Sequence, residues 1–138
     1  MTYLRKINYY ETDNMGIVHH SNYLRYFEEA RIDALAGAGL AYDKIEQLGI
    51  LIPVLDCKCR YIKSAGFGMS LKIDTEITAF DGIRMEMSYT AKNAESGEVI
   101  ATGSTGHCFL NTAFKPIRLK KEYPEVYKTL LALYEQGE

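Results

Sequence analysis

The chain has 138 residues, a hydrophobic fraction of 47% and a formal net charge of −2. This length suits a single domain over residues 1–138, and the nearly neutral charge gives no reason to expect nucleic-acid binding. No apolar run approaches the roughly 20 residues of a membrane span, and the first residues lack the apolar core of a signal peptide, so we expect a cytoplasmic protein without a membrane span.

The N-terminal part predicts a strand, a turn and a long amphipathic helix. Leu4–Glu11 is typical of a strand, and Asp13–Gly16 has the composition of a turn. Ser21 or Asn22 suits the N-cap of the helix, and glycines that follow residue 36 suit its end. Apolar or aromatic residues follow the i, i+3, i+4 spacing of one helix face: Tyr23, Tyr26, Phe27, Ala30, Ala34 and Leu35.

Strands dominate the rest of the chain. A short helix is predicted over Ala41–Leu48, and another helix over Pro124–Tyr134, where proline suits the first turn. Alternation of apolar and polar residues predicts four strands between them: Leu51–Ile62, Met69–Ala79, Arg84–Lys92 and Val99–Leu110. The order indicates an α+β fold with an antiparallel sheet and one principal helix.

Two further patterns concern packing and assembly. Cys57 and Cys59 share one face of a predicted strand and are interpreted as core residues, since three cysteines make no disulfide framework. The small residues of Gly103–His107 lack the strand-turn-helix context of a serine nucleophile, and we expect them to pack closely against the helix. One helix covers one face of a sheet, so apolar residues on the other face predict an oligomer.

Asp13 is the main catalytic candidate. It lies several residues before the predicted helix start, where free backbone N–H groups and a partial positive charge are expected. A carboxylate beside such donors can attack a carbonyl, or activate water against it, while the donors hold the carbonyl oxygen. An aspartate in this place can equally be a turn or capping residue.

Two neighbours of Asp13 are candidates for the same site. The backbone N–H of His20, and its ring, lie where they can hold a carbonyl oxygen. If the first strand continues, Tyr9, Glu11 and Asp13 share a face, and Tyr9 can hydrogen-bond near the carboxylate. His19 and His20 are adjacent in sequence and lack the spacing of a two-histidine metal site, so we predict no metal.

The opening motif resembles a known family. The pattern Tyr9-x-x-Thr-Asp13-x-Met-Gly-x-Val-x-His20-x-Asn22-Tyr23-x-x-Tyr-Phe-Glu-x-Ala-Arg31 is similar to that of hotdog-fold acyl-CoA thioesterases. The resemblance is to the 4-hydroxybenzoyl-CoA thioesterase family and its YbgC-like branch. It extends weakly through Ala101–His107 and the Lys115-Pro-x-Arg118 segment.

The resemblance implies a hotdog fold, with a long helix wrapped by a five-stranded antiparallel sheet, and a homodimer or homotetramer. It implies that Asp13 is the catalytic carboxylate, that His20 engages the thioester carbonyl, and that Tyr9 lies near the site. Asn22 and Tyr23 belong to the same motif and are candidates for substrate binding. His19 stands where the family commonly has tyrosine or tryptophan.

We therefore predict an acyl-CoA thioesterase that releases a free acid and coenzyme A. It needs no cofactor, since coenzyme A is part of the substrate. Candidate cations for the phosphates of coenzyme A are Arg60, Lys63, Lys115 and Arg118. We expect the active site near a subunit interface, with Asp13 and His20 from one chain and a wall that includes Tyr61 from another. The alternatives are an acyl-thioester hydratase or dehydratase on the same fold, and a non-catalytic acyl-thioester-binding protein.

Overall fold

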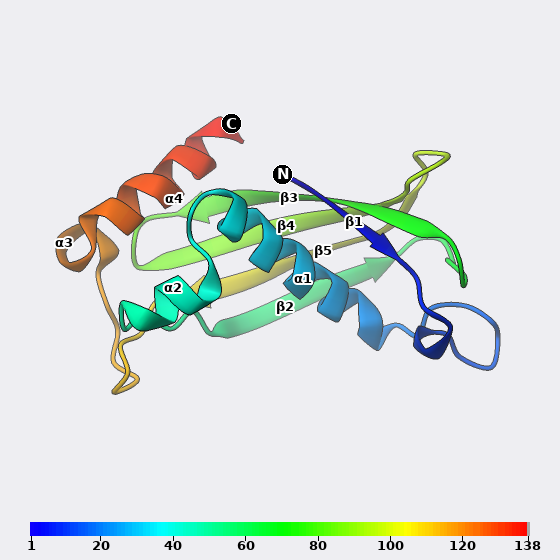
Figure 1. The fold of residues 1–138 in the computed structure, drawn as a ribbon, viewed down its shortest axis with the longest axis horizontal. Coiled ribbons are helices and arrows are strands. Elements are labelled where there is room, and N and C mark those ends of the chain that lie inside the picture. The colour runs from blue at the N-terminus through cyan, green and yellow to red at the C-terminus, as the bar shows by residue number, and fades with distance from the viewer. Residues whose placement is uncertain (138) are drawn as a thin grey trace. The chain divides into compact units, whose positions relative to one another are not determined.

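The computed structural model describes residues 1–137 and contains one five-stranded sheet (Figure 1). Its strands are β1 (Thr2–Lys6), β2 (Val54–Tyr61), β3 (Ser70–Phe80), β4 (Arg84–Asn93) and β5 (Val99–Cys108). Its helices are the 3₁₀ turn η1 (Tyr9–Glu11), α1 (Ser21–Gly37), α2 (Tyr42–Gln47), α3 (Leu119–Glu122) and α4 (Pro124–Gln136). No helix within residues 1–137 is long and apolar enough to cross a membrane.

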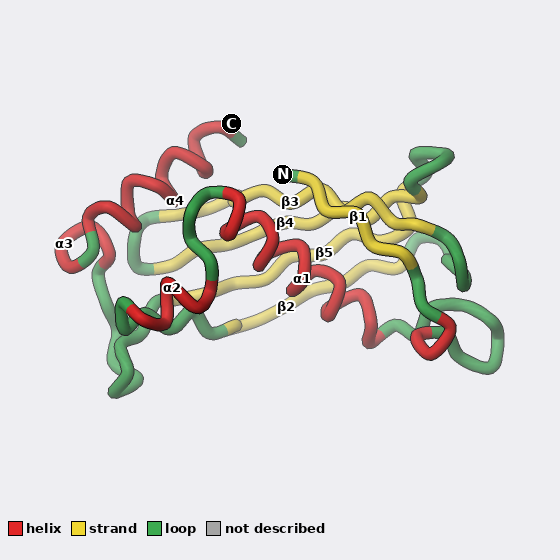
Figure 2. Tube along the Cα trace, viewed as in Figure 1, coloured by secondary structure: helices red, strands yellow, loops and turns green. Residues whose placement is uncertain are grey.

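The strand order in the sheet is β1-β3-β4-β5-β2 (Figure 2). β1 runs antiparallel to β3, with Thr2 opposite Asp74 and Lys6 opposite Ser70. The predicted α+β class, with a five-stranded antiparallel sheet and one principal helix, is confirmed. β2 lies at one edge of the sheet, and seven of its eight residues are exposed.

The chain divides into two compact units. The first unit comprises Met1–Ala34, Lys58–Thr75 and Tyr89–Gly103. The second unit comprises Leu35–Cys57, Glu76–Ser88 and the residues from Ser104 onward.

The core of the first unit forms where α1 faces the sheet. The ring of Phe27 stacks on that of Tyr89 with 4.8 Å between centroids, and Arg31 donates a hydrogen bond of 3.1 Å to the Tyr89 hydroxyl. Gly103 of β5 leaves the space that Phe27 occupies, as the pattern of small residues predicted. All six predicted apolar positions of α1 are buried: Tyr23, Tyr26, Phe27, Ala30, Ala34 and Leu35.

The core of the second unit forms around Phe80 at the end of β3. Its ring contacts Phe109, with 6.2 Å between centroids, and Tyr127 of α4, with 5.5 Å. Phe80 is buried while Ala79 is exposed, so the predicted placement of Ala79 on the buried face is wrong. The alternation shifts by one residue just before the turn at Gly82, whose φ is +86°.

Two strand boundaries differ most from the prediction. The first strand ends at Lys6 rather than Glu11, because η1 begins after Asn8. β2 begins at Val54 rather than Leu51, after Pro53, which has no N–H to donate. Cys57 is exposed and Cys59 only half-buried, so their interpretation as core residues is wrong for this edge strand.

The face of the sheet away from the buried side chains is polar rather than apolar. On β3 the residues that alternate with the buried ones include Lys72, Glu76 and Thr78, and on β4 they include Glu86 and Ser88. An apolar second face therefore gives no reason for oligomer formation, and the exposed edge strand β2 gives a better one.

The close contact at Gly103 predicts a difference between two glycines of β5. A Cβ at Gly103 would lie 2.5 Å from Phe27 Cε2 and 2.8 Å from the Lys58 carbonyl oxygen, and neither can move freely. A Cβ at Gly106 would meet only the carboxylate of Asp56, which can rotate away. We expect Gly103→Ala to lower the unfolding free energy by about 1–3 kcal/mol, and Gly106→Ala by under about 1 kcal/mol. Urea denaturation of both variants measures this, and equal losses would contradict it.

Candidate active site

Asp13 lies in a tight turn that holds one carboxylate oxygen and leaves the other available. The Asp13 N–H donates to the Ile17 carbonyl at 2.9 Å, and the Gly16 N–H donates to the Asp13 carbonyl at 2.9 Å. Oδ1 of Asp13 accepts the Met15 N–H at 2.8 Å, whereas Oδ2 accepts no hydrogen bond from residues 1–137. Gly16 has φ +77°, a conformation that favours glycine. The half-buried carboxylate is thus fixed in position with one oxygen free to react.

The start of α1 leaves one backbone donor available. The N–H of Asn22 donates to the His19 carbonyl at 3.0 Å, and that of Tyr23 to the His20 carbonyl at 3.3 Å. The Ser21 N–H donates to Nδ1 of His19 at 3.2 Å. Within residues 1–137, the His20 N–H donates no hydrogen bond. It is therefore the donor at this helix start that a ligand oxygen can use.

Asp13 and His20 line one pocket of the first unit. Its volume is about 310 Å³, and it is also lined by Met15, Ile17, Val18, Tyr23, Tyr61, Ile62, Lys63 and Ser64. The structure thus brings together a carboxylate, a free backbone N–H and an apolar wall. Such a set can hold a carbonyl oxygen and direct a carboxylate, or a water molecule beside it, at the carbonyl carbon.

Two tyrosines form one wall of the pocket. The Tyr61 hydroxyl donates to the His20 carbonyl at 3.4 Å, and its ring lies edge-on to that of His20, with 6.1 Å between centroids. Tyr23 is 4% exposed, and burial raises its pKa to about 12, with a further contribution from Cys59 and Tyr61. Tyr23 therefore stays neutral at ordinary pH. Tyr61 was expected on the opposite wall of the site from a neighbouring chain, whereas it lines the pocket of its own chain.

The position of the turn and of the helix start depends on Glu11. Its carboxylate accepts both terminal nitrogens of Arg5, Nη1 at 2.9 Å and Nη2 at 2.6 Å, and the Asn8 N–H at 2.8 Å. Its backbone carbonyl accepts the His19 N–H at 2.9 Å and the Asn22 side-chain amide at 2.8 Å. Glu11 therefore joins β1, η1 and the start of α1, with Asp13 two residues away.

The charge on Glu11 is stabilised by its partners. Burial alone would raise its pKa, but the hydrogen bonds from the Asn8 N–H and from Arg5 outweigh burial, so the pKa lies below its ordinary value. Arg5 also donates from Nε to Glu29 at 2.8 Å. The sequence prediction missed this cluster, although glutamate three residues after asparagine is a spacing typical of a capping box.

Tyr9 and Asn22 are placed outside the pocket lining. Tyr9 lies in η1 rather than on a strand, so the premise that it shares a strand face with Asp13 is wrong. Its side chain is 75% exposed and contacts the ring of Phe67, with 5.7 Å between centroids. Asn22 ties the helix start to Glu11 instead of lining the pocket.

The four candidate cations are not gathered at the pocket. Lys63 lines it and forms an ion pair with Glu98. Arg60 is exposed on β2 and is not among the lining residues. Lys115 and Arg118 belong to the second unit, and both are exposed.

No group of three or more histidine, cysteine or acidic side chains within residues 1–137 could hold a metal ion. The ring of His19 contacts that of His20, with 4.3 Å between centroids. His107 is buried, its Nδ1 lies 3.2 Å from the Pro53 carbonyl oxygen and its Nε2 lies 2.7 Å from the Thr105 hydroxyl. Because a carbonyl oxygen can only accept, the proton of a neutral His107 is on Nδ1.

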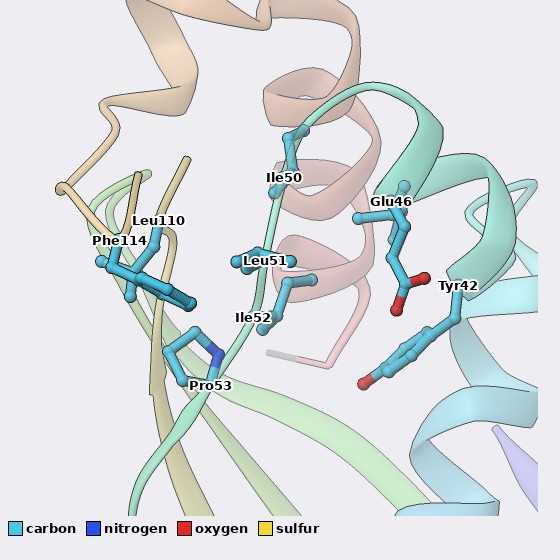
Figure 3. A pocket seen from close by; sticks show the side chains of 9 residues that line it. Tyr42, Glu46, Ile50, Leu51, Ile52, Pro53, Leu110 and Phe114 are labelled. Atoms are coloured by element: carbon cyan, nitrogen blue, oxygen red, sulfur yellow. The ribbon is translucent and has the colours of Figure 1, made fainter. Parts of the chain in front are cut away.

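The second unit has an apolar pocket of about 260 Å³ beside α2 (Figure 3). Ile50, Leu51, Ile52, Pro53, Leu110 and Phe114 form much of its wall. Its polar groups are those of Tyr42 and Glu46, and Glu46 is exposed. Because the Glu46 carboxylate is exposed, whereas that of Asp13 is half-buried and held by the Met15 N–H, the pocket of the first unit is the better candidate for carbonyl chemistry.

Comparison with known proteins identifies relatives that match about two thirds of the chain or more. A family model described as the thioesterase-like superfamily matches residues 7–130. A 1,4-dihydroxy-2-naphthoyl-CoA hydrolase of Thermosynechococcus vestitus is 30% identical, over 78% of this chain and 74% of its own length. The acyl-CoA thioester hydrolase YbgC of Escherichia coli is 26% identical, over 66% of this chain and 68% of its own.

A solved structure agrees with these relatives. The DHNA-CoA thioesterase of Staphylococcus aureus superposes with a TM-score of 0.90 at 33% identity, over 99% of this chain and 94% of that one. The resemblance to hotdog thioesterases is thereby confirmed, as is the hotdog fold.

The Arg5–Glu11 pair predicts a large and pH-dependent loss of stability on its removal. We expect Arg5→Met to lower the unfolding free energy at pH 7 by about 3–5 kcal/mol, since it leaves Glu11 charged, buried and unpaired. Lys92→Met breaks the more exposed pair with Asp74. It should lower the unfolding free energy by under about 1 kcal/mol.

The sign of the pH effect follows from the lowered pKa of Glu11. The stability that its charge contributes is present above the pKa of the unfolded chain and is lost as pH falls through the folded pKa. The deficit of Arg5→Met should therefore be largest near neutral pH and shrink on acidification. Chemical denaturation at several pH values measures it, and a deficit independent of pH would contradict this role.

Proposed function

Because this chain belongs to the thioesterase-like superfamily, we propose that it hydrolyses the thioester of an acyl-CoA, with Asp13 as the catalytic carboxylate. The family makes the chain an enzyme, a thioester hydrolase. The observation that supports the finer proposal is the pocket of the first unit. There, Asp13, with one carboxylate oxygen free, and His20, whose N–H has no partner within residues 1–137, line the same space.

In the proposed reaction the carbonyl oxygen accepts a hydrogen bond from the His20 N–H, which polarises the carbonyl. The Asp13 carboxylate then either takes a proton from an attacking water or attacks the carbonyl carbon itself, forming an anhydride that water opens. Negative charge grows on the carbonyl oxygen, where loss of one such donor typically costs about 2.7–4 kcal/mol of transition-state stabilisation. In the first route the proton that Asp13 takes from water passes to the sulfur as the carbon–sulfur bond breaks, so coenzyme A leaves as its thiol. In the second route the carbon–sulfur bond breaks as the anhydride forms, and coenzyme A leaves as a thiolate that takes a proton from solvent water.

The pocket also gives reasons for substrate binding. Met15, Ile17 and Ile62 offer apolar contacts to the groups that flank the thioester, and Lys63 is a cation at the same wall. Tyr23 stays neutral, so its hydroxyl can hydrogen-bond to the substrate but does not act as a base. The reaction needs no cofactor, coenzyme A enters as part of the substrate, and the cytoplasm remains the expected compartment.

Asp13→Asn should lower kcat by on the order of a thousandfold or more, because an amide neither attacks the carbonyl nor accepts a proton from water. Thiol release is measured across a panel of aliphatic and aromatic acyl-CoA substrates. The panel includes 1,4-dihydroxy-2-naphthoyl-CoA, since the relative from T. vestitus is named for that substrate.

Glu28→Gln is the matched control, because this carboxylate is exposed on α1 and does not line the pocket. It should keep near-normal turnover. Normal turnover by a folded Asp13→Asn protein would exclude the mechanism. Hydration of an enoyl thioester without thiol release would favour a hydratase, and binding without any turnover would favour a binding protein.

Activity should survive extensive dialysis against EDTA, because the proposed chemistry uses a carboxylate and a backbone N–H. Thiol release is compared before and after chelation, and again after addition of divalent ions. Loss on chelation followed by recovery with one of these ions would overturn the metal-independent mechanism.

We also propose that the chain forms a homodimer or homotetramer through β2. Exposed apolar side chains at and just beyond this edge strand are Val54, Leu55, Tyr61 and Ile62, each 49–50% exposed. An exposed apolar edge strand favours pairing with another strand. Tyr61 lines the same pocket as Asp13 of its own chain. The pocket therefore has this wall without a neighbouring chain.

Sedimentation velocity should show a dimer or tetramer for the parent chain. Leu55→Lys should shift it toward the monomer, because a lysine on an edge strand opposes pairing. Glu95→Lys, at an exposed turn between β4 and β5, is the control for added charge. A parent chain that sediments as a monomer at all concentrations would contradict this proposal.

A further inference from the structure

We propose that His19 is a positioning residue for the His20 N–H, and that its imidazole serves as the N-terminal cap of α1. This inference rests on the proposed function, because it concerns the donor that holds the thioester carbonyl.

The ring of His19 occupies a place that a short polar side chain usually takes. Helix starts are commonly capped by serine, threonine, aspartate or asparagine, whose oxygen accepts an N–H of the first turn. Here Nδ1 of His19 accepts the Ser21 N–H at 3.2 Å, and it lies 2.9 Å from the Ser21 hydroxyl. The ring therefore supplies an acceptor for the first N–H of the helix.

The hydrogen bonds at the helix start select which donor remains available. The His19 ring accepts a hydrogen bond from the Ser21 N–H. The His19 carbonyl accepts one from the Asn22 N–H, and the His20 carbonyl accepts one from the Tyr23 N–H. The His20 N–H is the one of these four without a partner in residues 1–137. His19 is also held from the other side, because its own N–H donates to the Glu11 carbonyl at 2.9 Å.

The cap determines which ring nitrogen of His19 carries the proton. To accept the Ser21 N–H, Nδ1 must carry no proton, so the proton of the neutral ring is on Nε2. The Arg25 guanidinium donates to the Ser21 hydroxyl at 3.1 Å and to the Asn22 side-chain oxygen at 3.3 Å. The second imidazole, that of His20, lies against the ring.

Loss of the cap has a chemical consequence beyond stability. Without the acceptor, the Ser21 N–H becomes a second free donor, and the peptide between His19 and His20 loses one of the constraints that orient its N–H, keeping the bond from the Asn22 N–H to the His19 carbonyl. A misplaced donor binds substrate nearly as well but stabilises the oxyanion less, so the loss falls on kcat rather than KM.

The test compares His19→Leu with His19→Asn, because Oδ1 of asparagine can accept the bond that Nδ1 accepts. His19→Leu should lower kcat on the order of tenfold to a hundredfold with little change in KM, and His19→Asn should restore most of that loss. The His19 side chain is exposed, so both variants should fold, which circular dichroism checks. Full kcat in His19→Leu, or an equal loss in folded His19→Asn, would overturn the proposal.

A second measurement separates this inference from the proposed function. Amide hydrogen exchange by NMR should find the Ser21 N–H protected in the parent and in His19→Asn, and exchanging faster in His19→Leu. Equal exchange in all three would overturn the cap. If the exchange pattern holds but the parent hydrolyses no acyl-CoA, the proposed function fails while the capping role stands.

Discussion

The arrangement of the candidate site depends on a buried carboxylate that is paired on one side and joined to the helix start on the other. The Glu11 carboxylate accepts two hydrogen bonds from Arg5. The Glu11 backbone carbonyl accepts hydrogen bonds from the His19 N–H and the Asn22 side-chain amide. A buried charge is costly unless it is paired and hydrogen-bonded. The same contacts that satisfy this charge therefore fix the segment that carries Asp13 against the segment that carries His20.

The reactive groups are those that this network leaves without partners. Nearly every polar group around the turn and the helix start is satisfied: Oδ1 of Asp13 by Met15, and the Ser21 N–H by His19. The second oxygen of Asp13 and the His20 N–H remain free at one pocket. Groups held in place before the substrate arrives need little reorganisation during the reaction, which is the condition under which such donors stabilise an oxyanion well.

The sequence predicted the parts of the fold that local patterns determine. The apolar face of α1, the α+β class and the alternation of β4 follow from periodicities of 3.6 and 2 residues. The end of the first strand could not be predicted this way, because it depends on Arg5 pairing with Glu11 and with Glu29, which lie on separate elements. Asp13 and His20 stood out because they flank a turn before a helix. Tyr61 was expected at the site from a neighbouring chain, because the sequence does not show that β2, forty-one residues beyond His20, reaches the same pocket.

A crystal structure with a ketone analogue of an acyl-CoA, in which a methylene group replaces the thioester sulfur, shows directly where the carbonyl lies. We expect its oxygen to lie about 2.7–3.1 Å from the His20 nitrogen, with Asp13 Oδ2 facing the carbonyl carbon directly or through one water. A carbonyl bound in another pocket, or one that leaves the His20 N–H unused, would contradict the assignment of Asp13 and His20 to the chemistry.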